Sequence, residues 1–357
     1  MSLRRLEVRD FRCIESAELE LDLRCNLISG ANASGKTSLL EAVFFLGRGR
    51  SFRTSRNETL IRCGNGELVV SGRVEGPVAG RAVGVRYTRD GFEAKVGGRR
   101  VGSLAELATV MPVQAIDPEV HRLIEEGPVE RRRYLDWGVF HVEPSFVNQW
   151  RRYQRALKQR NTALRAQAAD DVVEAWTPEL IVSGEALAAA RRRYFESLAV
   201  HVTQMGVRLL GLPVDLALNN GWAADSSLAD ALRASSLRDR ERMSTQVGPH
   251  RADLSVRVGG TLARHYVSRG QQKLTAAAML LGQLQCDAEW GSPTAAVLVD
   301  DPAAELDQEN LERLIKVVRD LPGQLFVTAL DPSVGAFAGL PAARRFHVEH
   351  GKITRLI

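Results

Sequence analysis

Gly30-Ala31-Asn32-Ala33-Ser34-Gly35-Lys36-Thr37 is the segment that decides the fold. It matches the pattern Gly-x-x-x-x-Gly-Lys-Ser/Thr, in which backbone N–H groups form a nest for phosphate oxygens. The lysine of such a loop reaches the β- and γ-phosphates, and the last hydroxyl group ligates Mg²⁺. An apolar run precedes this phosphate loop and a helical pattern follows it, which predicts a nucleotide site over Gly30 to Ser38 with Lys36 also serving catalysis. The alternative is a glycine-rich turn with an incidental lysine.

A carboxylate motif that suits the same site lies near the other end of the chain. Ala295-Ala296-Val297-Leu298-Val299 is short and apolar, as in a central parallel strand, and Asp300 and Asp301 follow it. We expect Asp300 to hold Mg²⁺ together with Thr37, and Asp301 to polarise the attacking water. The nucleotide site then forms only when both chain ends fold together. Alternatively, the paired aspartates only cap the following turn.

Hydrophobic periodicity predicts how the rest of the chain is organised. Residues 3–30 and 66–101 alternate as strands do, the latter as an antiparallel meander broken by glycine. From Pro118 to about residue 240 the chain is typical of helices, with Pro118, Pro128, Pro144 and Pro178 at first turns. Strands are expected again at 253–258, 295–299 and 324–328. The sequence therefore predicts an α/β head built from residues 1–117 and 241–357, with a helical arm domain over 118–240 inserted between them.

Composition excludes several classes of protein. The 357 residues are 45% hydrophobic and 25% charged, as in an ordinary soluble globular protein. No apolar run approaches the ~18 residues of a membrane helix, and four scattered cysteines indicate neither a zinc site nor a disulfide framework, so we expect a cytoplasmic protein. Of the 48 basic residues only six are lysines. This arginine excess reflects either codon bias or phosphate contacts, and a pI near 9.2 favours polyanionic partners.

Further motifs narrow the class of ATPase. Val267-Ser268-Arg269-Gly270-Gln271-Gln272-Lys273 opens a predicted helix before the acidic strand, and Ala304-Glu305-Leu306-Asp307 follows that strand. This order resembles the ABC-type ATPases, with a signature segment (residues 268–273) and a D-loop. Within that class the chain resembles the RecF family, bacterial recombination mediators of the SMC-like branch. The resemblance covers nearly the whole chain and also includes Leu6 to Arg12, Gly47 to Thr54, Glu130 to Trp137 and Val247 to Leu254.

The resemblance implies an ABC-type ATPase head that works as an ATP-dependent homodimer. Ser268, Gly270 and Gln271 would contact the γ-phosphate of ATP bound to the phosphate loop of a second copy. A serine hydroxyl and backbone N–H groups at a helix N-terminus are suitable anion ligands. Ser268 as an ordinary helix cap is the alternative, and both roles can hold at once.

Three positions depart from, or only weakly match, the pattern of transporter ATPases. Arg269 stands where those proteins carry glycine, and this arginine fits the signature motif of the RecF family. The stretch ending at Ala329 lacks their switch histidine, so we expect slow hydrolysis. Gln114 stands where a Q-loop glutamine would ligate the metal, although a surface glutamine is an equally good interpretation.

A basic stretch is the candidate DNA-binding surface. Residues 145–169 hold six basic residues and no acid, with apolar side chains at helical spacing. We assign Trp150 and Tyr153 to packing, which leaves another face free for phosphates. The alternative is a solvated face that neighbouring acids neutralise. The candidate DNA-binding residues are Arg151, Arg152, Arg155, Lys158 and Arg165.

These observations predict an ATP-dependent DNA-binding protein of recombinational repair that uses ATP and Mg²⁺. By resemblance, it would dimerise on ATP at double-stranded DNA near single-stranded gaps and help RecO and RecR to load RecA. DNA would stimulate its slow ATPase, and hydrolysis would reset a clamp. The alternatives are the nucleotide-binding subunit of an ABC transporter, or a P-loop kinase acting on a small molecule, which leaves the signature segment unexplained.

Overall fold

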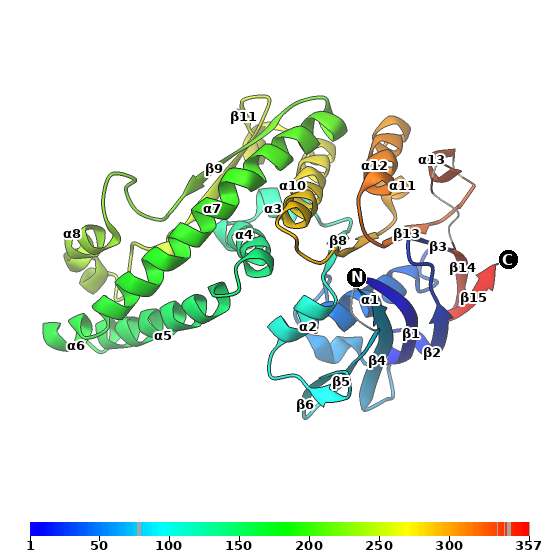
Figure 1. Ribbon diagram of the computed structural model, residues 1–357, viewed down its shortest axis with the longest axis horizontal. Coiled ribbons are helices and arrows are strands. Elements are labelled where there is room, and N and C mark those ends of the chain that lie inside the picture. The colour runs from blue at the N-terminus through cyan, green and yellow to red at the C-terminus, as the bar shows by residue number, and fades with distance from the viewer. Residues whose placement is uncertain (77–79, 334, 339, 341–343, 357) are drawn as a thin grey trace. The chain divides into compact units, whose positions relative to one another are not determined.

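The computed structural model describes residues 1–76, 80–333, 335–338, 340 and 344–356, and the chain forms two compact units. Unit 1 combines Met1–Val120 with Pro293–Ile357, and unit 2 is His121–Ser292. This division differs from the expected one, because residues 241–292 belong with the helical unit. Their main element, helix α10 (Arg269–Glu289), lies along α7 (Thr177–Leu210), as Figure 1 shows.

The central sheet of unit 1 has the order β15-β14-β3-β13-β12-β8. Its strands are parallel except β15, which pairs antiparallel with β14. The strands β3, β12 and β13 are buried along their whole length, which explains why they are mainly apolar and why β12 is apolar throughout. The bounds are β3 (Cys25–Ser29), β8 (Val113–Ile116), β12 (Ala296–Val299), β13 (Leu325–Ala329), β14 (Arg344–Glu349) and β15 (Lys352–Leu356). Because carboxyl ends of parallel strands meet at one edge, the loops after β3 and β12 lie together there.

A second, antiparallel sheet of unit 1 has the order β2-β1-β4-β5-β6-β7. It confirms the meander expected over residues 66–101. Helix α1 (Lys36–Arg48) is buried on nearly all sides, and one hydrophobic core joins it to both sheets. The strands are β1 (Ser2–Phe11), β2 (Ile14–Glu20), β4 (Glu67–Glu75), β5 (Arg81–Thr88), β6 (Gly91–Val96) and β7 (Arg99–Arg100). The remaining elements of unit 1 are η1 (Asn57–Leu60), α2 (Leu104–Val110), α11 (Pro302–Glu305), α12 (Gln308–Asp320) and α13 (Gly335–Ala338).

Unit 2 is mainly helical, but it also contains a sheet with the order β11-β10-β9. Strand β9 falls inside the stretch expected to be helical, and it pairs antiparallel with β10. Pro128 and Pro178 lie in the first turns of α4 and α7 as predicted, whereas Pro118 and Pro144 precede α3 and α5. The bounds are α3 (Arg122–Glu125), α4 (Pro128–Val142), α5 (Phe146–Arg165), α6 (Asp170–Glu174), β9 (Val214–Asn219), α8 (Leu228–Glu241), η2 (Pro249–Arg251), β10 (Asp253–Val258), β11 (Thr261–Leu262) and α9 (Ala263–Tyr266).

A buried carboxyl group ties α10 to α7 and makes the stability of the fold depend on pH. Asp287 accepts a hydrogen bond from the Tyr194 hydroxyl at 2.6 Å, and burial raises the pKa of Asp287 from 3.8 to about 7. Between these values the folded chain holds a proton that the unfolded chain has released. The free energy of unfolding therefore falls as pH rises through this window, by up to ~1.4 kcal/mol per pH unit, and levels off above it.

Asp287→Asn is expected to remove this slope, because the amide has no proton to release and its oxygen still accepts from Tyr194. Urea unfolding of wild type and variant, within the window and above it, measures the difference. A variant that keeps the wild-type slope would assign the pH dependence to another group.

Candidate nucleotide site

The phosphate loop of unit 1 has a backbone that only glycine accommodates at two positions. Gly30 has φ +153° and Gly35 has φ +117°. A Cβ at Gly30 would lie 2.3 Å from the carbonyl oxygen of Val348, which is backbone and cannot move aside. The carbonyl of Ser34 also accepts the Gly351 N–H at 2.8 Å, which fixes the loop to the hairpin of β14 and β15. These constraints fix the backbone of the loop in the conformation that a phosphate nest requires.

Two side chains of the loop are set for an anion. Lys36 is only 6% exposed, and its Nζ donates to the carbonyl oxygens of Gly30 and Ala31 at 2.8 and 3.0 Å. The ammonium group is thus folded over the loop and has a third donor to offer. The buried Ser34 hydroxyl has no hydrogen-bond partner in the described part of the chain. An orphaned buried hydroxyl costs free energy unless a ligand satisfies it, and phosphate oxygens would do so.

Asp300 joins the acidic strand to the phosphate loop. The Thr37 hydroxyl lies 2.9 and 3.0 Å from the two Asp300 carboxylate oxygens, and the Thr328 hydroxyl donates to one of them at 2.8 Å. Burial raises the pKa of Asp300, while the hydrogen bonds from Thr328 and Thr37 oppose that shift. A divalent cation beside Thr37 and Asp300 would stabilise the charged carboxylate. The described residues include no group of three or more His, Cys, Asp or Glu side chains that could hold a metal ion by themselves.

Asp301 has the position and freedom that a catalytic carboxylate needs. Its φ is +44°, and its N–H donates to the Thr328 hydroxyl at 2.7 Å, so the backbone is fixed. The carboxylate is half-buried and makes no hydrogen bond or ion pair with the residues that the structure describes. Asp300 is bonded to Thr37 and Thr328 whereas the Asp301 carboxylate is unbonded, so the two carboxylates can take different roles.

Gln114 lies in β8 beside the acidic strand. It is 6% exposed, so the interpretation as a surface glutamine is wrong. Its Oε1 accepts from Arg48 at 3.4 Å, and in the sheet register it stands opposite Val297. Asp300 donates its N–H to Ile116 at the end of the same strand. The position is compatible with the metal role, which stays a prediction.

Sequence reasoning missed residues that hold this site in place. Thr328, at the end of β13, bonds both aspartates but is an ordinary residue in an apolar strand. Glu41 of α1 is fully buried, and its two carboxylate oxygens accept hydrogen bonds from Nε and Nη2 of Arg12, at 2.9 Å each. Ser51 also donates to Glu41. Arg12 and Ser51 fall in stretches that carried the family resemblance, which was the available signal.

The signature segment lies in unit 2 and begins α10. Ser268 accepts from the Gln271 N–H at 3.3 Å, and Gln271 accepts from the Ser268 N–H at 3.0 Å, which is a capping box. The helix-cap role of Ser268 is thus confirmed. Ser268, Gly270 and Gln271 are all exposed. Their contact with the ATP of a second copy remains a prediction.

The basic residues of α5 do not form a uniform set. Arg152 makes a two-pronged ion pair with Glu179 at 2.7 and 2.9 Å, so its charge is neutralised. Tyr153 is buried as expected, but Trp150 is 41% exposed, so its assignment to packing was wrong. The other candidates are exposed, and none makes an ion pair within the described residues: Arg151, Arg155, Lys158 and Arg165.

Comparison with known proteins identifies the family. The RecF/RecN/SMC N-terminal domain family matches residues 2–351. The DNA replication and repair protein RecF of Shewanella oneidensis is 38% identical over 357 residues, which covers 99% of each chain. The chain belongs to the RecF family. The RecF of Pseudomonas paraeruginosa is 39% identical over 364 residues, covering 99% of this chain and 98% of that one.

Solved structures agree with this RecF assignment. A structure described as the recombination mediator protein RecF with ATP in the RecFOR pathway superposes with a TM-score of 0.87 at 27% identity, over 100% of this chain and 98% of that one. An SMC head bound to the C-winged helix domain of ScpA gives a TM-score of 0.60 at 17% identity over 100% and 98%, a likeness of fold alone. The expected ABC-type α/β ATPase head is confirmed, and membership of the RecF family excludes the transporter and kinase alternatives. No described helix combines the length and apolar character needed to cross a membrane.

Proposed function

We propose that this RecF-family chain is an ATP-dependent DNA-binding recombination mediator. In this role it dimerises on ATP at duplex DNA near single-stranded gaps, and with RecO and RecR it promotes the loading of RecA. The observation that carries the proposal is the hydrogen bond between Thr37 and Asp300, which brings a phosphate loop and an acidic strand from opposite chain ends into one site.

The residues of unit 1 fit ATP with Mg²⁺. The loop N–H groups and the Ser34 hydroxyl would bind phosphate oxygens, and Lys36 would leave its carbonyl partners for the β- and γ-phosphates. Thr37 and Asp300 would hold Mg²⁺, with Gln114 as a further candidate ligand, and the ion would neutralise phosphate charge. Asp301 would orient and deprotonate the attacking water. Because β13 ends in Thr328 and Ala329 rather than a histidine, we propose that hydrolysis is slow.

Dimerisation would complete the site with the signature segment of a second copy. In each chain the N-terminus of α10 presents exposed N–H groups and the Ser268 hydroxyl, which suit a γ-phosphate. The long capped helix supplies a stable dipole for this contact. ATP would therefore join two chains, and its hydrolysis would release them and reset the clamp.

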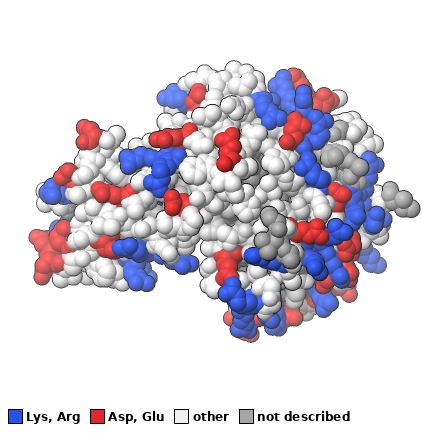
Figure 2. All heavy atoms as spheres, viewed as in Figure 1, with Lys and Arg blue, Asp and Glu red and all other residues white. Residues whose placement is uncertain are grey.

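The unpaired cations of α5 support duplex DNA as the partner. Arg151, Arg155 and Lys158 recur at helical spacing on one exposed face, and Figure 2 shows basic side chains over part of this helix. Such a row suits phosphates on any sequence. The alternative interpretation is a solvated face whose charges neighbouring acids neutralise. It holds for Arg152, which pairs with Glu179, but not for these three residues.

The direct test is the ATPase rate of the purified chain with and without duplex DNA. Duplex DNA is expected to raise the rate, because binding on one long molecule brings two chains together. Lys36→Ala, which is expected not to bind ATP, is the negative control of the ATPase assay. An ATPase rate that duplex and gapped DNA both leave unchanged would refute the DNA-coupled function.

Reversing Arg151, Arg155 and Lys158 to glutamate is expected to weaken duplex binding on every sequence. The slope of log K against log salt flattens by up to ~0.9 for each phosphate that the protein no longer neutralises. Fluorescence anisotropy across a salt series measures the slope, and ATP binding is the internal control. Arg152→Glu is the matched variant, with a smaller expected effect because Glu179 already neutralises Arg152. An unchanged slope in the triple variant would place the DNA surface elsewhere.

A further inference from the structure

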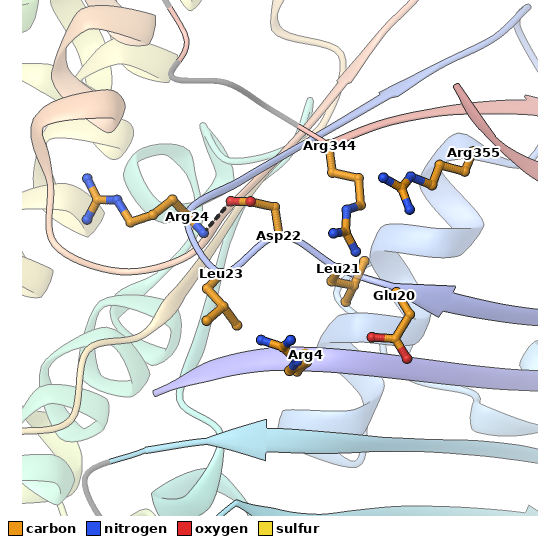
Figure 3. A pocket seen from close by; sticks show the side chains of 8 residues that line it. All are labelled: Arg4, Glu20, Leu21, Asp22, Leu23, Arg24, Arg344 and Arg355. Atoms are coloured by element: carbon orange, nitrogen blue, oxygen red, sulfur yellow. Dashed lines mark hydrogen bonds between the residues drawn. The ribbon is translucent and has the colours of Figure 1, made fainter. Parts of the chain in front are cut away.

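A charged pocket of about 380 Å³ lies in unit 1, at the end of β3 remote from the phosphate loop. Figure 3 shows that its walls come from β1, from the turn between β2 and β3, and from the hairpin of β14 and β15. The phosphate loop follows Ser29, whereas the pocket is lined by Arg24 and by Arg344, which stands opposite Asn26 in the sheet. The five residues of β3 separate the two places by roughly 15 Å. The pocket is therefore distinct from the ATP site.

Three arginines face this pocket, and two of them make no ion pair within the described residues. Arg344 and Arg355 extend from the hairpin toward the same space, with Arg4 of β1 opposite them, while Arg24 extends the other way (Figure 3). Neither Arg344 nor Arg355 makes an ion pair within the described residues, whereas Arg4 forms an ion pair with Glu75, with Nε 3.4 Å from a carboxylate oxygen.

Some surface arginines of unit 1 pair with a carboxylate on an adjacent strand or loop, whereas no such pair involves Arg344 or Arg355 within the described residues. Arg5 lies 2.7 Å from Glu18, and Arg100 lies 2.8 Å from Glu93. Guanidinium groups that share a hollow repel one another, and an anion between them reduces the repulsion. The planar guanidinium group of arginine can donate two parallel N–H hydrogen bonds to the oxygens of a phosphate.

The acids of the pocket narrow the choice of ligand. Asp22 is already committed, because one oxygen accepts the N–H groups of Arg24 and Cys25 at 2.7 and 2.9 Å. Glu20 is exposed and makes no hydrogen bond or ion pair in the described chain. A continuous phosphate backbone would be repelled by Glu20, whereas a ligand with one phosphate group and nearby hydroxyl or amino donors satisfies both sides. The volume is in the range of pockets for small molecules, about 300–1,000 Å³.

We propose that this arginine pocket binds the terminal phosphate of a single nucleotide unit, either a free nucleotide or the phosphorylated end of a nucleic-acid strand. Arg344, Arg355 and Arg4 hold the phosphate, and Glu20 accepts from the sugar or base. Leu21 and Leu23 supply the apolar part of the wall. The site goes beyond the proposed ATPase cycle and does not depend on it.

The test uses the full chain carrying Lys36→Ala, so that nucleotide binding at the phosphate loop does not dominate the calorimetric signal. Calorimetric titration with adenosine monophosphate is expected to show binding. Replacing Arg344 and Arg355 together by alanine is expected to weaken it at least tenfold. Arg345→Ala is the matched control, since Arg345 is the exposed neighbour of Arg344 in β14 and does not line the pocket. Thermal unfolding of each variant establishes that it is folded.

Two further arms distinguish the sources of the phosphate. Short duplexes with a 5′-phosphate or a 5′-hydroxyl end are compared with adenosine monophosphate on the same chain. Tighter binding of the phosphorylated end that depends on Arg344 and Arg355 assigns the pocket to strand ends, and tighter binding of the monophosphate assigns it to free nucleotides. Phosphate binding that ignores Arg344 and Arg355, or falls equally in Arg345→Ala, overturns the proposal. Because the loop lysine is already absent, a failure here leaves the ATPase proposal untouched.

Discussion

Lys36→Ala is expected to abolish ATP binding, whereas Asp301→Asn is expected to keep ATP bound and lose its hydrolysis. Lys36 is buried and would contact two phosphates through charge-assisted hydrogen bonds, each worth about 1.5–3 kcal/mol, so its removal lowers the affinity at least ~100-fold. Asp301→Asn leaves Thr37, Asp300 and Lys36 in place. It removes only the base that accepts the proton of water, a change of about 10²–10⁴-fold in rate.

Equilibrium titration with a fluorescent ATP analogue and Mg²⁺ measures ATP binding, and single-turnover kinetics measure hydrolysis. The two measurements together separate the effects of the two variants. Lys316→Ala in α12 is the control for removal of a positive charge, since Lys316 is exposed. Hydrolysis at the wild-type rate by Asp301→Asn would remove Asp301 from catalysis. Tight ATP binding by Lys36→Ala would place the nucleotide outside the phosphate loop.

The parts of this site that the sequence predicts are those fixed by local rules. The phosphate loop needs glycine at two positions of positive φ and a lysine at a set spacing, so its pattern can be recognised from the sequence alone. The strand before Asp300 is a short apolar run because both of its faces are buried. The meander over 66–101 is marked by alternation and glycine. In each case neighbours in the chain determine the structure.

The parts that the sequence did not predict depend on neighbours far along the chain. Thr328 donates a hydrogen bond from β13 to Asp300 at the end of the neighbouring strand β12, and nothing beside Thr328 in the sequence marks that role. Residues 241–292 join the helical unit because α10 lies along α7, a contact between distant segments. Trp150 has the spacing of a core residue and is nevertheless exposed, since spacing assigns a helix face but not what covers it. Gln114 was ambiguous for the same reason.

A mixing experiment tests whether two chains share one ATP site. Ser268→Arg keeps an intact phosphate loop and is expected to bind ATP alone, but its side chain blocks the signature from a partner's γ-phosphate. Loss of the capping box costs about 1 kcal/mol, which a helix of 21 residues packed in unit 2 tolerates. Ser268→Ala is the control, because it removes the cap without adding bulk. Light scattering with ATP and Mg²⁺ is expected to show monomers for Ser268→Arg.

Mixing Ser268→Arg with Lys36→Ala then restores one site in each mixed dimer, from the phosphate loop of the first chain and the signature of the second. Since neither variant is active alone, ATPase activity of the mixture can come only from that shared site. Random pairing sets its upper limit at about a quarter of the wild-type rate. If Ser268→Arg by itself dimerises on ATP as the wild type does, Ser268 is a helix cap and nothing more. The clamp would then have to close through other contacts, because an arginine at the start of α10 cannot share the space of a γ-phosphate.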